Sequence, residues 1–423
     1  MDHVFSSWAG REAPNPHTER AKTVMRRGEI GPYKKARTLI LLMLVPLLSG
    51  CWDRVEMNDV ALFMASGLDI TEDGRIFVSI QVPIPSKEGT SGTLDKTYYV
   101  ISASGTNIYD VERKCQQLLS RKFFKGHRRV VFIGEKFAKK GIKEILDYYS
   151  RDPATRLRTY LVVAKGKQAV ELMRTDHPYE RIPSEEVREL ERNGVGTAVT
   201  FRDFLINQER DGIVPVLGAV EIQKPQVLVE KEDEKSKLNV FHLSSTAVMK
   251  NYKLVGYLND IETRSLRWMK GELKHEYLAE RIPEAGGSVG VVLKKTEKKI
   301  KTVIKDGKAN IHIELSGDGL LNESNVELDI SRPESVAIIE QGLSKLITKQ
   351  TLHSIRKAQT ELKSDIFGFG LLVHQYQFGT WKTVRDDWDT IFSKADVFVD
   401  TKIHLRRAGM ISSSLENKGV HTE

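Results

Sequence analysis

The length, composition and charge of the chain limit what it can be. At 423 residues it is long enough for two or three domains, and its 40% hydrophobic and 29% charged residues are typical of a protein that folds in water. Half of the formal net charge of +8 lies in the first fifty residues, which hold eight Lys and Arg against four acids. The remaining charge is of mixed sign, so we expect no nucleic acid partner. The two cysteines, Cys51 and Cys115, are too few for a disulfide framework or a structural zinc site, and we expect neither a metal nor a cofactor.

The first fifty residues contain the three parts of a secretory signal. Three basic residues between positions 34 and 37 precede an apolar run at 39–48, and the small residues Ser49 and Gly50 follow it. At 1.5 Å per residue this run makes a helix of about 15 Å, half of the roughly 30 Å hydrocarbon core of a bilayer. The run is therefore too short for a permanent span. Residues 1–50 are predicted to direct export and then to be removed.

Cys51 stands where a lipoprotein signal places its cysteine. Leu48-Ser49-Gly50-Cys51 is a branched aliphatic residue, two small residues and a cysteine. The small side chains let a peptidase approach the backbone and cleave between Gly50 and Cys51, and the thiol can be alkylated to a thioether that carries diacylglycerol. Two acyl chains give stable attachment, whereas one chain holds only marginally. We therefore predict that Cys51 anchors the chain in membrane lipid, with its body on the outer face of the cytoplasmic membrane.

The residues before Met25 have no place in such a signal. Met25-Arg26-Arg27 would be a more ordinary start for a basic region followed by an apolar run. We therefore expect either a start codon that has been placed too early or an extra N-terminal extension.

The segment 51–195 is predicted to be an N-terminal α/β domain. An apolar run at 60–68 and an alternating run at 75–84 flank a turn, which predicts a β-hairpin. Helical and strand patterns then alternate at 109–119, 129–133, 139–149 and 160–164. Such alternation predicts a sheet that is covered by helices on at least one face. A last helix should run from Pro183 to Asn193.

A middle domain at 196–275 and a C-terminal α/β domain at 276–412 are predicted to follow. Strand and turn patterns at 214–218 and 254–257 define the middle domain. In the C-terminal domain, two alternating strands are predicted around residues 309–315 and 397–405, with a long amphipathic helix that begins at Pro333 between them. The tail at 413–423 is predicted to be disordered. The fold class expected is α+β (mixed α/β), with three domains that are each a sheet with packed helices.

No catalytic constellation is recognisable in the sequence. The chain has no nucleophile elbow, no HExxH motif, no P-loop and no GxGxxG string that opens a helix. The string Gly368-Phe369-Gly370 lacks a third glycine, so it predicts a turn rather than a phosphate cradle. The histidines are scattered without metal-ligand spacing, and the paired acids at 386–387 predict a helix N-terminus packed between aromatic residues. We therefore expect a binding protein and not an enzyme.

Several strings in a fixed order link the chain to a known family. They are Gly50-Cys51-Trp52-Asp53, Gly67-Leu68-Asp69, Val130-Val131-Phe132-Ile133-Gly134-Glu135, Arg151-Asp152-Pro153, Leu254-Val255-Gly256-Tyr257-Leu258, Ser364-Asp365-Ile366-Phe367-Gly368-Phe369-Gly370 and Arg406-Arg407-Ala408-Gly409. In this order the chain resembles the Ger(x)C family, the lipoprotein C subunits of nutrient germinant receptors in endospore-forming bacteria. The resemblance implies three α/β domains and a receptor completed by two integral membrane subunits, one A-type and one B-type.

Gly256, Glu262, Arg264 and Trp268 are the best candidates for a contact with another subunit. Glu262 and Arg264 are two residues apart on a segment that we expect to be irregular. Charge-assisted hydrogen bonds from such a pair can order a loop or present a polar edge to a partner. Both alternatives, a structural role and a subunit contact, stay open at this point.

The sequence thus predicts a noncatalytic, membrane-anchored receptor subunit of the spore inner membrane. It would be required for nutrient-triggered spore germination, through binding and coupling to the integral membrane subunits. The alternative is a solute-binding lipoprotein of a membrane transporter. That alternative predicts two similar lobes around a ligand cleft, and the sequence has no internal repeat of that kind.

Overall fold

The computed structural model describes residues 59–84, 97–175, 180–224 and 239–407, together with a few single positions. The predicted signal segment, apart from four single positions, lies outside the described residues, as do Cys51 and the tail at 413–423. Helices and strands alternate along the described part of the chain. The strands form more than one sheet, and helices pack against the sheets. The mixed α/β class predicted from the sequence is therefore confirmed.

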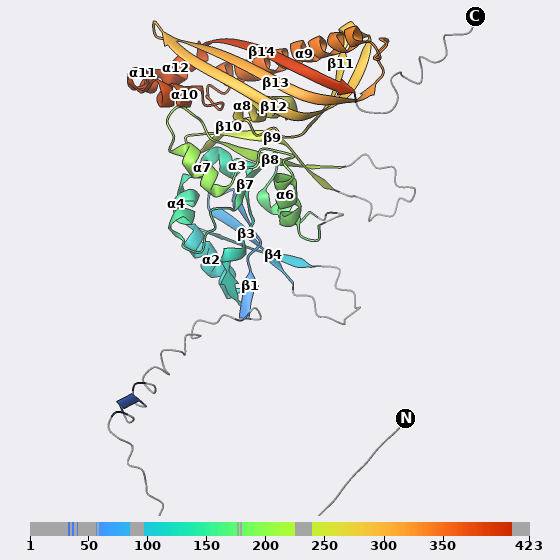
Figure 1. The fold of residues 1–423 in the computed structure, drawn as a ribbon. Coiled ribbons are helices and arrows are strands. Elements are labelled where there is room, and N and C mark those ends of the chain that lie inside the picture. Colours follow the sequence, from blue (N-terminus) through green and yellow to red (C-terminus); the bar gives the residue numbers. More distant parts are fainter. Residues whose placement is uncertain are drawn as a thin grey trace, which may run out of the picture. The chain divides into compact units, whose positions relative to one another are not determined.

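The larger sheet has eight strands (Figure 1). They are β2 (Ala65–Ile70), β3 (Ile76–Pro83), β4 (Tyr98–Gly105), β6 (Val130–Gly134), β7 (Tyr160–Ala164), β8 (Val216–Gln223), β9 (Val240–Lys250) and β10 (Lys253–Leu258). Their spatial order is β10-β9-β8-β7-β6-β2-β3-β4, with β2, β6, β7 and β8 parallel and the outer pairs antiparallel. The predicted hairpin at 60–84 is present as β2 and β3. The short strands β1 (Val60–Leu62) and β5 (Lys122–Phe124) form a separate parallel pair.

Helices cover both faces of this sheet. Four helices share the core of one face: α2 (Ile108–Gln117), α3 (Glu135–Lys140), α4 (Lys143–Arg151) and α7 (Phe201–Gln208). Two helices share the core of the other face: α5 (Ala169–Met173) and α6 (Pro183–Arg192). The central strands β6 and β7 consist almost entirely of apolar residues. A parallel strand that has helices on both faces of its sheet is buried on both sides, so it has no polar face. The single helix predicted at 139–149 is divided into α3 and α4 at Gly141, whose φ of 124° is accessible to glycine.

The strands of the predicted middle domain do not form a sheet of their own. β8 pairs in parallel with β7, from Val162 opposite Gly218 to Ala164 opposite Val220, and β9 and β10 extend the same sheet. The expectation of a separate sheet within 196–275 is therefore wrong. Without β8, the apolar strand β7 would leave a row of backbone N–H and C=O groups unpaired in the interior. The division of the chain into three domains stays a prediction.

The smaller sheet has four strands and a long helix packed on one face (Figure 1). The strands are β11 (Glu276–Ile282), β12 (Gly287–Lys305), β13 (Lys308–Ser324) and β14 (Asp396–Arg407), in that spatial order. The helices that share its core are α8 (Asp260–Lys270), α9 (Pro333–Thr360), α10 (Phe369–Tyr376), α11 (Phe378–Val384) and α12 (Trp388–Ser393). Short 3-10 turns lie at Lys125–His127, Pro283–Ala285 and Arg385–Asp387. The predicted alternation of β13 is confirmed, because Ile311 and Ile313 are buried while His312 and Glu314 are exposed.

Candidate functional site

The segment that carries Glu262, Arg264 and Trp268 is a helix, α8. Its N-cap is Asn259, whose side chain accepts from Glu262 N at 3.0 Å, while the Glu262 carboxylate accepts from Asn259 N at 2.8 Å. This is a capping box, and Gly271 ends the helix in the left-handed conformation with a φ of 76°. The expectation of an irregular segment is therefore wrong. The spacing of Asn259 and Glu262 followed by apolar residues was a signal for this helix that our sequence reasoning missed.

The Glu262 carboxylate joins α8 to α9. It is 2% exposed, and its Oε2 accepts from the Lys357 ammonium at 2.7 Å in addition to Asn259 N. His353 Nε2 lies 3.6 Å from Oε1. A buried carboxylate is tolerated when its charge is balanced and its oxygens are hydrogen-bonded. Lys357 and His353 both lie on α9, so this group fixes the position of one helix on the other.

Arg264 extends this connection to β11. Its guanidinium donates to Glu280 Oε1 at 2.9 Å and to Gln350 Oε1 at 2.8 Å. Glu280 is on β11 and Gln350 is on α9, about one turn before His353 and two turns before Lys357. Because the planar guanidinium has several donors in fixed directions, it can hold two elements at once.

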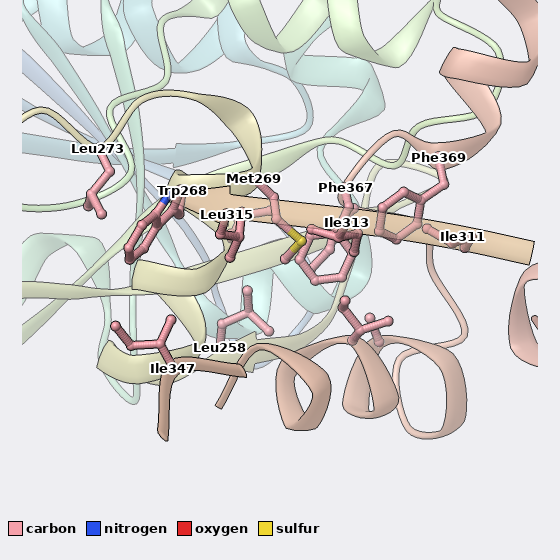
Figure 2. Close-up of a cluster of buried hydrophobic side chains, with 14 of the residues drawn as sticks. Leu258, Trp268, Met269, Leu273, Ile311, Ile313, Leu315, Ile347, Phe367 and Phe369 are labelled. Carbon is pink, nitrogen blue, oxygen red and sulfur yellow. The ribbon is translucent and has the colours of Figure 1, made fainter. Parts of the chain in front are cut away.

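Trp268 lies inside the core of the smaller sheet. It is 2% exposed, and its indole Nε1 donates to the carbonyl of Glu297 on β12 at 3.1 Å. Figure 2 shows its ring among Leu273 of the loop after α8, Leu315 of β13 and Ile347 of α9. A large aromatic ring with its one donor satisfied is a typical anchor for a core between elements.

Gly256 is placed where a strand of the larger sheet approaches α9. A Cβ at this position would lie 2.5 Å from Leu362 Cδ2, just beyond the end of the helix. A larger residue would therefore push against the apolar side chain that closes this core.

The structure thus brings the four predicted residues together at the contact between the two sheets. The side chains of Glu262, Arg264 and Trp268 bind other parts of the same chain. Their partners are Lys357 and Gln350 on α9, Glu280 on β11 and the backbone carbonyl of Glu297 on β12. This arrangement supports the structural alternative. Whether the cluster also contacts another subunit stays a prediction.

A second connection surrounds Asp365, in the glycine-rich string before α10. Asp365 Oδ1 accepts from the three successive backbone N–H groups of residues 367–369 at 2.9 to 3.2 Å. Its Oδ2 accepts from Gly370 N at 2.8 Å and from Trp388 Nε1 at 3.0 Å. Complete burial raises the pKa of this carboxyl to about 6, and the donors of Gly370, Trp388, Phe369 and Gly368 partly oppose that rise. The string predicted to be a turn instead opens a helix: Gly368, with a φ of 80°, is the N-cap of α10, and Phe369 and Gly370 are its first residues.

The backbone groups that could have cradled a phosphate are therefore occupied by the side chain of Asp365. The same segment binds the loop that enters β8, because Val214 N donates to Asp365 O at 2.7 Å and Leu371 N donates to Gly212 O at 2.9 Å. Asp365 is thus a positioning group between the two sheets. The sequence drew attention to the glycines of this string but not to the aspartate that organises them.

Within the described residues, no group of three or more His, Cys, Asp or Glu could hold a metal ion. No helix among them is both long enough and apolar enough to cross a bilayer. His312 and His404, which the alternation places on polar strand faces, are exposed. The side-chain contacts described so far join elements of the same chain.

Two family models match this chain in succession. The spore germination protein N-terminal domain matches residues 53–222, and the spore germination B3/GerAC-like C-terminal domain matches residues 244–409. The chain belongs to the GerAC-like family of spore germination proteins. The resemblance to the Ger(x)C family that the sequence strings indicate is therefore confirmed.

Individual relatives cover nearly the whole GerAC-like chain. The Bacillus subtilis protein YfkR is 27% identical over 390 residues, which is 90% of this chain and 98% of YfkR. Spore germination protein KC of Bacillus subtilis is 24% identical over 396 residues, which is 90% of this chain and 97% of KC. The crystal structure of the GerBC protein matches with a TM-score of 0.53 at 22% identity, covering 83% of this chain and 99% of GerBC, and this likeness shows the fold.

The boundary between the two family models crosses the larger sheet of this GerAC-like protein. The N-terminal model ends at residue 222 within β8, and the C-terminal model begins at residue 244 within β9. These two strands are hydrogen-bonded neighbours. The two family domains therefore share one sheet in this protein.

Proposed function

We propose that this GerAC-like protein is the lipoprotein C subunit of a nutrient germinant receptor in the spore inner membrane. A diacylglyceryl group on Cys51 would hold it on the outer face of that membrane. It would act without catalysis, by binding two integral membrane subunits, one A-type and one B-type, and coupling their response to nutrients. Such a subunit would be required for nutrient-triggered spore germination.

The observation that carries this proposal is the combination of family and anchor in one chain. The match to GerAC-like proteins extends from residue 53 to residue 409, and the lipoprotein signal ends two residues before it begins. A tether keeps the protein close to the membrane subunits and so raises its effective concentration near them, even where direct contacts are weak. The backbone hydrogen bonds of Val214 with Asp365 and of Leu371 with Gly212 hold the two sheets of this body together.

The alternative of a solute-binding lipoprotein receives no support from the described part of the chain. That alternative requires two similar lobes around a ligand cleft. In the described residues the two sheets differ in strand number and in topology, with eight strands in one and four in the other. A binding subunit of a germinant receptor does not require such symmetry.

The anchor is tested by Cys51→Ser. We expect the wild-type protein to incorporate a radiolabelled lipid precursor and the variant to incorporate none, because only a thiol forms the thioether. Cys115→Ser is the matched control, because Cys115 is completely buried and its pKa is raised to about 11 by burial. Lipid on the Cys51→Ser variant would show that the anchor has been assigned wrongly.

The receptor role is tested by a clean deletion of the gene. Spores without the protein should fail to germinate with one or more nutrients and should still germinate with agents that act without a receptor. Normal germination with every nutrient, in a strain that has no second receptor of this family, would contradict the proposed function.

A further inference from the structure

One edge of the smaller sheet borders a groove. β14 is the last strand of this sheet, and a groove of about 1110 Å³ runs between it and α9. Ile403 N donates to Ser344 Oγ at 3.1 Å, and Leu405 N donates to Glu340 Oε1 at 2.7 Å, both on the helix. In a strand with one neighbour, alternate residues direct both backbone groups to that neighbour. The odd-numbered residues of β14 therefore direct their N–H and C=O groups away from β13.

Polar side chains of α9 line half of this edge, and two of them accept hydrogen bonds from its backbone. Glu340, Ser344 and Thr348 are four residues apart, and Thr348 Oγ1 lies 2.9 Å from Thr401 Oγ1. Four residues of a helix rise about 6 Å and two residues of a strand rise about 6.6 Å. Every fourth residue of α9 therefore lies opposite every second residue of β14 along the groove. The next two positions of this helical row, Leu352 and Arg356, also line the groove.

The other half of the edge is open. Neither Leu352 nor Arg356 carries a hydrogen-bond acceptor, and they occupy the positions of the row that correspond to Val399 and Val397. Among the described residues, the outward N–H groups of Val397 and Val399 have no acceptor. A strand edge with free donors and acceptors is a template for an added strand.

The side chains around this open half specify what can be added. Leu352 is 36% exposed and Phe398 is 55% exposed, so apolar surface flanks the edge. The basic side chains of Lys349 and Arg356 line the groove without an ion-pair partner among the described residues. In contrast, the acids of β14 are already paired, Asp396 with Lys308 at 2.7 Å and Asp400 with Lys402 at 3.8 Å. Glu340, which also lines the groove, lies on the covered half and accepts from Leu405 N, so the unpaired charge of the open half is positive.

We propose that the edge of β14 at Val397–Val399 binds a short, extended, acidic segment of a partner protein as a fifth strand of the smaller sheet. The added backbone pairs with residues 397 and 399, and its carboxylates meet Lys349 and Arg356. This inference rests on the proposed function for the identity of the partner, which would be another subunit of the receptor.

A second copy of this chain fits the edge less well. In an antiparallel pair of two β14 strands centred on Thr401, the outward backbone groups of residues 397 and 399 in one copy would bond those of residues 405 and 403 in the other. The backbone N–H groups of Ile403 and Leu405 are already bound by Ser344 and Glu340 of α9. The free edge is long enough for a short segment and too short for a symmetric pairing of whole strands.

Hydrogen exchange on the purified full chain tests this site directly. The probe is a blocked seven-residue peptide of alternating Val and Glu, compared with the same peptide carrying Lys in place of Glu. We expect the Glu peptide to slow the exchange of two amides within residues 396–400, and the Lys peptide to do so much less. Equal protection by both peptides, or none by either, would overturn the proposal.

The free chain supplies two further outcomes in the same experiment. Protection of these amides before any peptide is added, if it disappears when residues 408–423 are deleted, would show that the chain covers its own edge. Protection that increases with protein concentration would show a second copy. Either result would overturn the assignment to a partner.

Val399→Pro removes the donor and leaves the pairing with β13 intact, because the Val399 N–H faces the groove. It should weaken binding of the Glu peptide about tenfold, the effect of one lost backbone hydrogen bond. Val399→Thr is the matched control, since it keeps both the N–H and a β-branched side chain. Arg356→Glu should also weaken binding, whereas Lys136→Glu, at an exposed position of α3 on the larger sheet, should not.

Germination assays on spores that carry these variants distinguish this inference from the proposed function. Val399→Pro should lower nutrient germination at normal protein abundance, while Val399→Thr should not. If the clean deletion has no effect on germination but the peptide still binds, the receptor role fails and the strand site stands. If the deletion blocks germination and Val399→Pro binds the peptide as well as wild type, the strand site fails and the receptor role stands.

Discussion

Glu191 on α6 has a carboxyl group that the protein buries without a hydrogen-bond partner. It is 2% exposed, and neither oxygen has a partner among the described residues. Burial raises its pKa to about 8, and the charge of Arg267 opposes this rise. Gly218 leaves the space that the carboxyl occupies, since a Cβ there would lie 2.6 Å from Glu191 Oε1. At neutral pH the folded protein therefore favours the protonated form of this side chain.

The Glu191 carboxyl makes the stability of the protein depend on pH. Its pKa is near 4.5 in the unfolded chain and about 8 in the folded protein, so the folded state binds the proton more tightly. Its contribution is fully present below about pH 4.5 and is lost as the pH rises toward 8. Glu191→Gln should remove this loss, because an amide does not ionise. The free energy of unfolding of the variant, relative to that of wild type, should therefore be higher at pH 9 than at pH 5 by on the order of 2 to 4 kcal/mol.

Urea unfolding at pH 5, 7 and 9 measures the effect of Glu191→Gln. Glu189→Gln on the same helix is the control, because Glu189 lies at the surface with Arg188 and Arg192. That variant should change stability by a similar small amount at each pH. Parallel pH profiles for wild type and Glu191→Gln would contradict the assignment of a raised pKa.

Asp365→Asn tests the carboxylate that organises the glycine-rich string. An amide has one acceptor oxygen where the carboxylate has two, so either Gly370 N and Trp388 Nε1 or the N–H groups of residues 367–369 would face a donor. We expect a loss of about 2 to 4 kcal/mol in the free energy of unfolding. Asp386→Asn is the control, since that side chain is exposed. Unchanged stability and unchanged tryptophan fluorescence would contradict the proposed role of Asp365.

At the scale of elements, α8 and α9 are held together by a pair of opposite charges that differ in exposure. The Glu262 side chain is 3% exposed and that of Lys357 is 19% exposed. Removing the partner of a buried charge costs more than removing the pair, because one charge then stays buried and uncompensated. The link therefore specifies how the helices pack, whatever its net contribution to stability.

Lys357→Met should destabilise the protein by about 2 to 4 kcal/mol, because it leaves the buried Glu262 carboxylate without its positively charged partner. The double variant Glu262→Gln with Lys357→Met should recover part of this loss. A double-mutant cycle from urea unfolding gives the coupling energy between the two residues. Additive effects of the single variants would show that the pair does not couple α8 to α9.

The same reasoning distinguishes a structural role of α8 from a subunit contact. Trp268→Ala should lower nutrient germination in proportion to a loss of protein abundance in spores, because it creates a cavity in the core of the smaller sheet. Germination that is lost at normal abundance would instead favour a direct contact with another subunit.

At the scale of the whole molecule, the two sheets depend on each other. Val216 of β8 and Val248 of β9 belong to the larger sheet, yet they are buried in the core that Trp268 and α9 share. The backbone bonds of Val214 and Leu371 join the same two regions. A fragment that contains only the segment between the two sheets would leave exposed the apolar side chains that it buries against each of them.

The fragment 196–275 should therefore remain unfolded when it is expressed alone. It contains β8, β9, β10 and α8 but lacks β7 and α9, the elements against which β8 and α8 pack. Circular dichroism should show no cooperative thermal transition, whereas the full chain should show one. A cooperative transition in the fragment would support an independent middle domain.

Sequence patterns located most of the elements but not their neighbours. The alternation of β13, the apolar strands β6 and β7 and the proline that opens α9 are local properties, and each is visible in a short window. The candidate site was predicted in part: Glu262, Arg264 and Trp268 were selected, while Lys357, Gln350 and Glu280 were not. The partners lie between 16 and 95 residues away along the chain, at distances that local patterns do not span.

By itself, the sequence determined the mixed α/β class, the family and the prediction of a lipid anchor, because these depend on local periodicity and on short ordered strings. Only the tertiary structure decided that β8 joins the larger sheet, that Asp365 fills its own glycine-rich cradle and that half of the β14 edge is left open. Each of these depends on which backbone and side-chain groups remain unsatisfied after distant segments have packed together. That balance is set across the whole fold, and no window of the sequence contains it.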